Sequence, residues 1–328
     1  MTYDIEKAYG VTEIGELTYK GNSALSKPSQ ASRGVYGGSI AAQAVLVAIK
    51  SSPDGFRPHS LHSSFVKPVS PKEPIIWKVQ IISNGKNFCN RTITGTQGNE
   101  IKYYANVSLT RKNSLKRATM EYENYKAKLE RGDDDDDDDD EGVVQKPFGF
   151  QSPYHKWFTP DSVNKLKEIP LVFNQLKVYH KFSPKFVDLD ATKEEESIPP
   201  AERSLSFYTK FGEEGEISYD DDAYNYVGLA VLSDTVFLAS LGRALRLRHI
   251  DLRHGIHYFS VSLDHTIYFH DEDFDPRKWM MFSFRYPRLS NDRLLVEGEM
   301  YNDKGVQVAT VIQEGLVKLN GLEQGAKL

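Results

Sequence analysis

The chain is poor in several features that define common classes of protein. It contains one cysteine, Cys89, in 328 residues, which excludes an intramolecular disulfide and is typical of a reducing compartment. Its first ten residues, MTYDIEKAYG, include no apolar run, so we expect no secretory signal. It has neither a P-loop nor a dinucleotide-binding glycine fingerprint, and no basic footprint typical of nucleic-acid binding. We therefore expect no cofactor and no nucleic-acid partner.

Negative charge is concentrated in one run. Eight consecutive aspartates, Asp133 to Asp140, account for much of the acidic balance, and the remainder of the chain is close to neutral. Like charges in a block repel one another and cannot bury apolar surface. We therefore predict a disordered acidic linker over residues 116–146. A metal site on the aspartates is disfavoured because such a run lacks the fixed geometry that a cation requires.

Two stretches predict buried helices. The first, Val35 to Lys50, is rich in alanine and apolar on two faces. The second, Val227 to Leu245 (VGLAVLSDTVFLASLGRAL), is apolar on nearly every side and would be roughly 28 Å long. Asp234 and Arg243 lie within it and its flanks are polar, which favours a buried helix over a membrane span. A carboxylate there must be paired, hydrogen-bonded or neutral, so Asp234 is a candidate functional acid.

Strand-like runs surround each helix. They are separated by hairpin signals such as Asn84-Gly85 and Gly98-Asn99, which indicate antiparallel pairing. Each half of the chain is therefore predicted to contain one or more strands, then a helix, then an antiparallel meander of strands. We predict an α+β fold made of two similar units. The predicted strands are residues 13–22, 61–69, 74–83, 88–97 and 100–110 in the first half, and 173–182, 204–211, 257–270, 279–290, 293–302 and 306–319 in the second.

Two familiar catalytic patterns are disfavoured. The segment Gly37 to Ala41 resembles the G-x-S-x-G nucleophile elbow, but it ends in alanine, and an elbow also requires a parallel sheet. Its glycines are better explained by close helix packing. His254 and His257 have no third ligand nearby, so we expect no zinc site. His265 and His270 are interpreted as ordinary strand histidines.

Polar residues in otherwise apolar elements of the second half remain as candidates. They are Asp234 in the helix, Ser262 and Asp264 in one strand, and Gln313 in another. Each also has a structural interpretation. Asp234 could cap a helix break, Ser262 could point outward, and Gln313 could lie at a sheet edge.

The segments LSDTVFLASLGRAL, VSLDHTIYFH and VATVIQEGLVKL resemble the second half of the type II acyl-CoA thioesterases. RGVYGGSIAAQAVLVA, LHSSFVKPV and ISNGK are similar to the first half of that family. The resemblance implies a double hotdog, in which each of two antiparallel sheets wraps around a central helix. It implies an N-terminal domain at residues 1–115, a C-terminal domain with the catalytic residues at 147–320, and a tail at 321–328. Because hotdog domains have exposed sheet edges, we also expect a homo-oligomer.

The resemblance further implies hydrolysis of fatty acyl-CoA to a free fatty acid and CoA. By position, Asp234, Ser262 and Gln313 would hold and activate the attacking water, without a covalent intermediate. A double-hotdog enoyl-CoA hydratase is the first alternative, but the G-D-x-N-P-x-H type motif of such enzymes is not found. A non-catalytic acyl-CoA-binding protein is the second.

The last three residues, Ala326, Lys327 and Leu328, are a close variant of the peroxisomal signal Ser-Lys-Leu. They match the peroxisomal members of the family that the chain resembles. We therefore expect location in the peroxisomal matrix and a peroxisomal import receptor as a partner.

Overall fold

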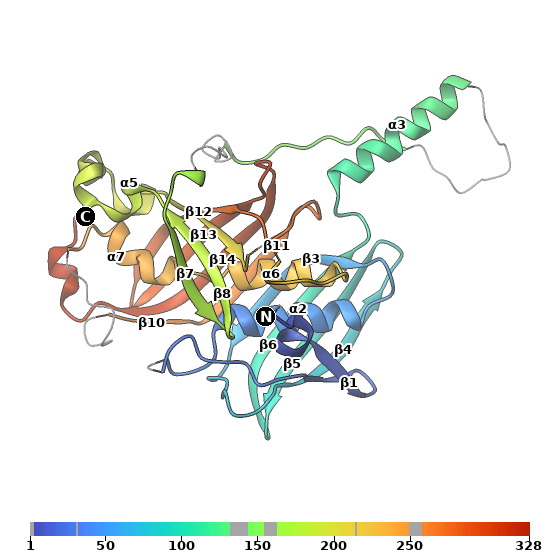
Figure 1. Ribbon diagram of the computed structural model, residues 1–328, viewed down its shortest axis with the longest axis horizontal. Coiled ribbons are helices and arrows are strands. Elements are labelled where there is room, and N and C mark those ends of the chain that lie inside the picture. Colours follow the sequence, from blue (N-terminus) through green and yellow to red (C-terminus); the bar gives the residue numbers. More distant parts are fainter. Residues whose placement is uncertain (1–2, 31, 132–143, 154–162, 214, 249–257) are drawn as a thin grey trace.

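The computed structural model describes residues 3–30, 32–131, 144–153, 163–213, 215–248 and 258–328. Its strands form one 14-stranded antiparallel sheet that curves around two apolar helices (Figure 1). The sheet order is β1-β2-β4-β5-β6-β3-β11-β14-β13-β12-β9-β8-β7, and β10 also pairs with β14.

The first half wraps six strands around α2 (Gly37–Lys50). Along β5, buried and partly exposed side chains alternate, which is the pattern of a strand with one face on the core. Eleven residues of α2 are buried, so this helix is the centre of the first unit. The other elements are α1 (Ile5–Tyr9), β1 (Val11–Gly15), β2 (Thr18–Gly21), β3 (Arg57–Phe65), β4 (Ile76–Asn84), β5 (Phe88–Gln97) and β6 (Glu100–Thr110).

The second half repeats this plan around α6 (Ala223–Leu232), nine of whose residues are buried. Short 3-10 helices occur at η2 (Leu189–Ser197), η3 (Pro200–Glu202), η4 (Phe237–Ser240) and η5 (Leu322–Gly325). The remaining elements are β7 (Glu168–Phe173), β8 (Leu176–Phe182), α5 (Pro184–Val187), β9 (Leu205–Phe211), α7 (Leu241–Ala244), β10 (Phe259–Ser262), β11 (Asp264–Phe269), β12 (Met280–Ser290), β13 (Arg293–Tyr301) and β14 (Gln307–Lys318).

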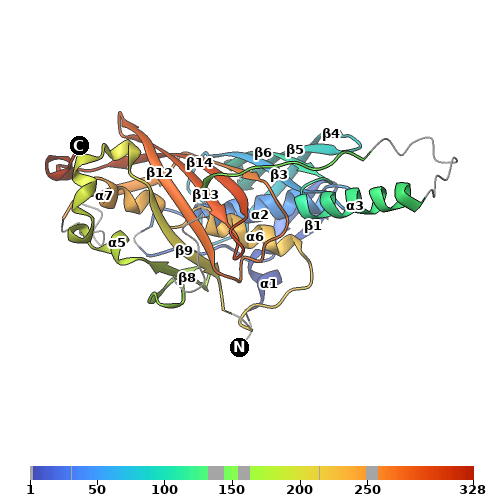
Figure 2. The same ribbon diagram turned by 90° about the horizontal axis from the view of Figure 1, so that it is seen from above.

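The halves join through both their sheets and their helices. Strand β3 pairs antiparallel with β11, and the buried side chains of Leu61 and Ile267 lie opposite each other. Helices α2 and α6 lie side by side in both views (Figures 1 and 2). The Tyr36 hydroxyl donates a hydrogen bond to the Val231 carbonyl at 2.8 Å. The two units therefore share one continuous interior.

The predicted continuous helix over 227–245 is wrong; most of its apolar residues are buried as expected, but Val236 and Leu238 are only partly buried. Helix α6 ends at Leu232, Val236 adopts a φ of 66°, and η4 and α7 follow. The Thr235 hydroxyl donates to the Leu232 carbonyl, and Ser233 Oγ lies 2.9 Å from the Ala230 carbonyl oxygen, three residues earlier in each case. Such local bonds compete with the regular helical ladder. Asp234 therefore lies in a break between two helical segments.

The apolar segment does not require a membrane. Among the described residues, the 22-residue stretch Ala223–Ala244 is long and apolar enough to cross one, but 72% of its most apolar window is buried inside the protein. This is the burial expected of a core segment.

Three further predictions need correction. Residues 13–22 form parts of two strands, β1 and β2, and residues 259–269 form β10 and β11 with a break at Leu263. Strand β7 was not predicted. Part of the predicted disordered linker is helical, because α3 spans Leu115–Arg131, has no buried residue and projects from the body (Figures 1 and 2). The aspartate run lies outside the described residues.

Candidate active site

Asp234 is placed where the two central helices meet. Its Oδ2 accepts a hydrogen bond from the backbone N–H of Gly38 at 2.8 Å. Gly38 lies in the first turn of α2, where N–H groups have no partner within the helix and the helix dipole favours negative charge. The first half of the chain therefore stabilises a carboxylate that belongs to the second half.

Gly37 and Gly38 explain how the start of helix α2 approaches the end of helix α6 and Asp234 so closely. A Cβ on Gly37 would lie 2.7 Å from Asp234 Oδ2, and a Cβ on Gly38 would lie 2.8 Å from the Val231 carbonyl oxygen. Both distances are too short for any side chain. The interpretation of these glycines as residues that permit close helix packing is therefore confirmed.

Gln313 connects the acid to the predicted hydroxyl. It lies on β14 on the same face as the buried residues Val311 and Gly315, and its own side chain is fully buried. Its Nε2 donates to Ser262 Oγ at 2.6 Å and to Asp234 Oδ1 at 3.2 Å. The structure thus brings together the three side chains that the resemblance implied. Because β14 pairs with strands on both sides, Gln313 does not lie at a sheet edge.

Burial raises the pKa of the Asp234 carboxyl to about 7, although the hydrogen bonds from Gln313 and Gly38 favour the charged form. The residue nevertheless keeps partial exposure to solvent. An acid with a pKa near 7 can exchange a proton at neutral pH, and partial exposure lets a water molecule reach it. These are the requirements of a general base.

His265 was missed as a site residue, since it was interpreted as an ordinary strand histidine. Its Nδ1 hydrogen-bonds Gln313 Oε1, and its Nε2 lies 2.8 Å from Ser233 Oγ. The ring is fully buried, and burial lowers the His265 pKa to about 4. The sequence signal was its alternation with the apolar residues Ile267 and Phe269, which places all three side chains on one face of the strand.

Asp264 is not part of the cluster. Its Oδ1 accepts from the backbone N–H of Glu314 at 2.6 Å, beside the break between β10 and β11. Its role is to hold the irregular part of the sheet. His254 and His257, the disfavoured zinc ligands, lie outside the described residues.

Partly buried apolar side chains flank the polar cluster. The Phe65 ring lies beside Gly37, where a Cβ would be 2.9 Å from it. Leu238 lies beside Gly315, the residue that pairs with Ser262. The hydroxyls of Tyr286 and Tyr258 donate to the carbonyls of Phe237 and Leu238, which anchors the segment after Asp234. Apolar side chains from both halves of the chain therefore border the polar cluster.

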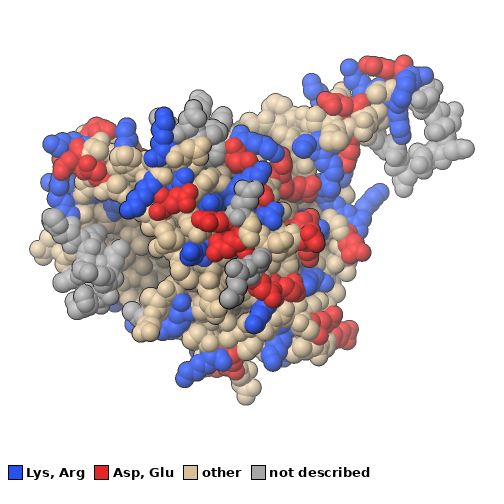
Figure 3. Space-filling view, viewed as in Figure 1, with Lys and Arg blue, Asp and Glu red and all other residues tan. Residues whose placement is uncertain are grey.

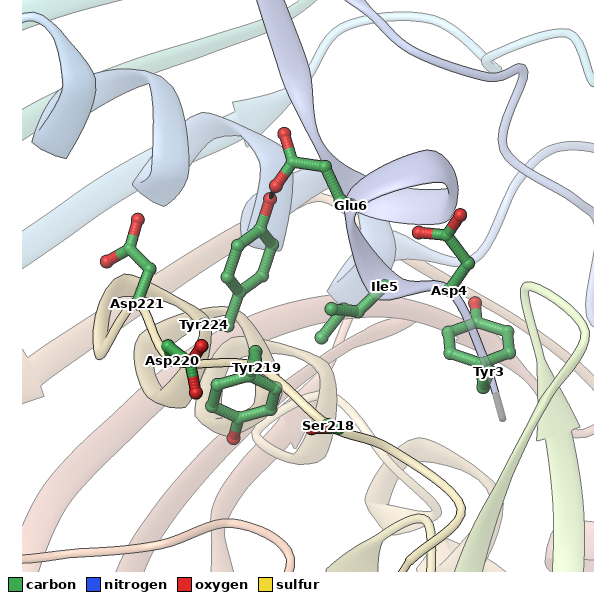
Figure 4. Close-up of a pocket in the computed structure, with 9 residues that line it drawn as sticks. All are labelled: Tyr3, Asp4, Ile5, Glu6, Ser218, Tyr219, Asp220, Asp221 and Tyr224. Atoms are coloured by element: carbon green, nitrogen blue, oxygen red, sulfur yellow. Dashed lines mark hydrogen bonds between the residues drawn. The ribbon is translucent and has the colours of Figure 1, made fainter. Parts of the chain in front are cut away.

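A surface cavity between α1 and the segment before α6 is distinct from this cluster. Figure 4 shows the carboxyl groups of Asp4, Glu6, Asp220 and Asp221 around it, with the Tyr224 hydroxyl donating to Glu6. Such a lining would repel the phosphates of CoA. A second cavity, over β12 to β14, also includes none of the three candidate residues. On the face seen in Figure 3, cations and anions are interspersed, and no single basic patch marks a phosphate site.

Two helix-wrapped antiparallel sheets joined edge to edge define a double hotdog protein. A solved acyl-CoA thioesterase II from Mycobacterium marinum shares this fold, with a TM-score of 0.64, 19% identity, and coverage of 97% of this chain and 98% of that one. Residues 25–111 match the model of the acyl-CoA thioesterase N-terminal domain, and residues 133–317 match that of the C-terminal domain. The chain belongs to the acyl-CoA thioesterase family and is an acyl-CoA thioester hydrolase.

Named relatives match over most of their length. The chain is 27% identical over 315 residues to the peroxisomal acyl-coenzyme A thioester hydrolase 1 of Saccharomyces cerevisiae, covering 87% of this chain and 86% of that protein. It is 25% identical over 318 residues to acyl-coenzyme A thioesterase 8 of Mus musculus, covering 96% and 89%. The expected family, fold class and enzyme class are confirmed.

Proposed function

We propose that Asp234, Ser262 and Gln313 hydrolyse the thioester of fatty acyl-CoA by activating a water molecule for direct attack. The observation that carries this proposal is the meeting of a carboxylate of raised pKa with a hydroxyl and an amide from two strands. Asp234 takes a proton from the water, whose oxygen forms a bond to the carbonyl carbon. The carbon–sulfur bond then breaks, and CoA leaves as a thiolate.

Ser262 and Gln313 position the reacting groups without changing their own charge. Gln313 donates to Ser262 Oγ, which leaves the hydroxyl hydrogen of Ser262 able to point at the water or at the developing oxyanion. A free cysteine thiol has a pKa of about 8.5, and a thiolate of this kind, such as that of CoA, leaves with little help from a general acid. The flanking apolar side chains of Phe65 and Leu238 favour a fatty acyl chain as the substrate group.

Ser262 provides a matched test of the site. Ser262→Ala should lower kcat for palmitoyl-CoA by on the order of 10²-fold, the scale of a lost oxyanion donor. Ser262→Thr keeps the hydroxyl and should stay within about tenfold of the wild type. Release of free CoA thiol measures both. Equal activity of the Ala and Thr variants would show that the hydroxyl has no role.

We infer a peroxisomal matrix location from the terminal tripeptide, and the name of the yeast relative supports it. Leu328 is 88% exposed, so its side chain and carboxylate are open to an import receptor. Ala326 packs against the core, and the backbone N–H of Lys327 donates to the Leu245 carbonyl at 3.0 Å. The receptor would have to detach these two residues to bind the tripeptide in an extended form.

Deletion of residues 326–328 should leave thiol release unchanged and keep the protein in the cytosol. The matched control replaces the tripeptide with Ser-Lys-Leu, which should restore import. Fluorescence microscopy of tagged chains, with the tag at the N-terminus, reads out location. Import of the truncated chain would contradict the assignment of the signal.

A further inference from the structure

The amide of Gln313 is held from both ends. Its Nε2 donates to Asp234 and Ser262, and its Oε1 meets His265 Nδ1. A flipped amide would turn Oε1 toward the Asp234 carboxylate, so two acceptors would face each other. The site therefore depends on one of the two orientations of the Gln313 amide, although the two have nearly the same shape.

The contacts also fix which nitrogen of His265 carries the proton. Gln313 Oε1 is only an acceptor, so Nδ1 must donate. The imidazole is neutral, because burial lowers its pKa to about 4, and Nε2 is then an acceptor. The single hydroxyl hydrogen of Ser233 can point to Nε2, 2.8 Å away, or to the Ala230 carbonyl, 2.9 Å away; because Nε2 carries no hydrogen, the hydroxyl donates to Nε2. A chain of donors thus runs from Ser233 through His265 to Gln313.

The backbone of His265 is fixed as well. Its carbonyl accepts a hydrogen bond from the buried Ser63 hydroxyl at 2.7 Å, across the pairing of β3 with β11. The ring itself is fully buried. A ring held at both nitrogens and at its backbone can impose an orientation on a neighbour.

We propose that His265 is a positioning residue for hydrolysis: it holds the Gln313 amide with its nitrogen toward Asp234 and Ser262, and Ser233 holds His265 in the required tautomer. This proposal rests on the function proposed for Asp234, Ser262 and Gln313. Because the His265 ring is fully buried and meets Gln313, its effect is transmitted through the amide.

The proposal predicts a specific pattern of kinetic losses. His265→Leu, similar in size but without a donor, should lower kcat by about 10-fold to 10²-fold and leave KM nearly unchanged, because the lost orientation affects the attacking water. His265→Asn places an amide N–H near the position of Nδ1 and should recover most of that loss. Ser233→Ala, which leaves the ring in place, should lower kcat several-fold. Thermal unfolding establishes that each variant is folded.

A double-mutant cycle separates positioning from a general structural effect. Because His265 acts only through Gln313, the variant with both His265→Leu and Gln313→Leu should be no slower than Gln313→Leu alone. A fold-loss of kcat in the double variant equal to the product of the losses in the two single variants would overturn the proposal. A folded His265→Leu with wild-type kcat beside a slow Gln313→Leu would overturn it while leaving the proposed site intact. A Gln313→Leu variant with wild-type kcat would instead refute the proposed site itself.

If His265→Leu does not fold, the kcat and KM of Ser233→Ala, compared with those of the wild type, test the proposal. A kcat reduced several-fold at unchanged KM supports the tautomer role of Ser233. An unchanged kcat overturns it.

Discussion

Asp234→Asn should make the protein a slower enzyme and, above neutral pH, a more stable one. The variant removes the charge that the interior disfavours and keeps an oxygen that can accept from Gly38 N–H. It also removes the carboxylate that we propose takes the proton from water. We therefore expect kcat to fall by on the order of 10²-fold or more, the scale of a lost general base.

The sign and size of the stability change follow from the pKa. The Asp234 carboxyl has its ordinary pKa of 3.8 in the unfolded chain and a pKa of about 7 in the fold. Between these values the unfolded chain is ionised while the folded chain still holds its proton, so wild-type stability falls as pH rises from about 4 to 7. At 1.36 kcal/mol per unit, the loss between pH 4 and pH 8 is on the order of 3 kcal/mol, and partial solvent exposure reduces it.

The asparagine variant lacks this titration. Its free energy of unfolding, relative to that of the wild type, should therefore increase with pH. Repulsion between its amide N–H groups and those of Gln313 would lower its stability equally at every pH and would not change this trend. Urea unfolding of both proteins at pH 4, 6 and 8 measures the difference, and other titrating groups cancel in the comparison. Thiol release from palmitoyl-CoA measures activity. A stability difference independent of pH, or near-normal turnover, would refute the assignment of Asp234.

Two further predictions concern the same carboxylate. The kcat/KM of the wild type should rise with pH up to about 7 and then level off, because only the ionised Asp234 accepts a proton; a profile that is flat from pH 5 to 8 would contradict this. Gly37→Ala places a Cβ 2.7 Å from Asp234 Oδ2 and should lower kcat by about 10-fold to 10²-fold. Gly15→Ala is the control, since its Cβ would lie 3.9 Å from Thr18, and equal activity of the two variants would count against the close approach at Gly37.

The sequence predicts regular elements well where one periodicity continues over many residues. The helix expected at 35–50 is α2, and the strand expected at 88–97 is β5 with the same bounds. It fails where tertiary contacts override local preference. The apolar pattern continues through Asp234, but the backbone turns at Val236, whose φ of 66° no side-chain pattern announces.

The candidate site is predictable only in part, for a related reason. Asp234 is conspicuous because a carboxylate interrupts an apolar run, and the family resemblance supplied Ser262 and Gln313. His265 alternates with Ile267 and Phe269, which indicates an inward side chain, but only the fold shows that its ring meets Gln313. The contribution of Gly38 is equally invisible, since it comes from a backbone N–H and from the other half of the chain.

The two halves have the same plan but unequal chemistry, and buried polar side chains show why. In the first half, Gln43 is the buried amide of the central helix, and its Oε1 accepts from Trp77 Nε1 at 3.3 Å while its Nε2 donates to the Tyr9 carbonyl at 3.3 Å. Both ends are satisfied within the core, by an indole N–H and a backbone carbonyl. In the second half, the amide of Gln313 instead faces an acid with partial access to solvent. The first hotdog therefore contributes the N-terminus of α2, where the Gly38 N–H binds the Asp234 carboxylate.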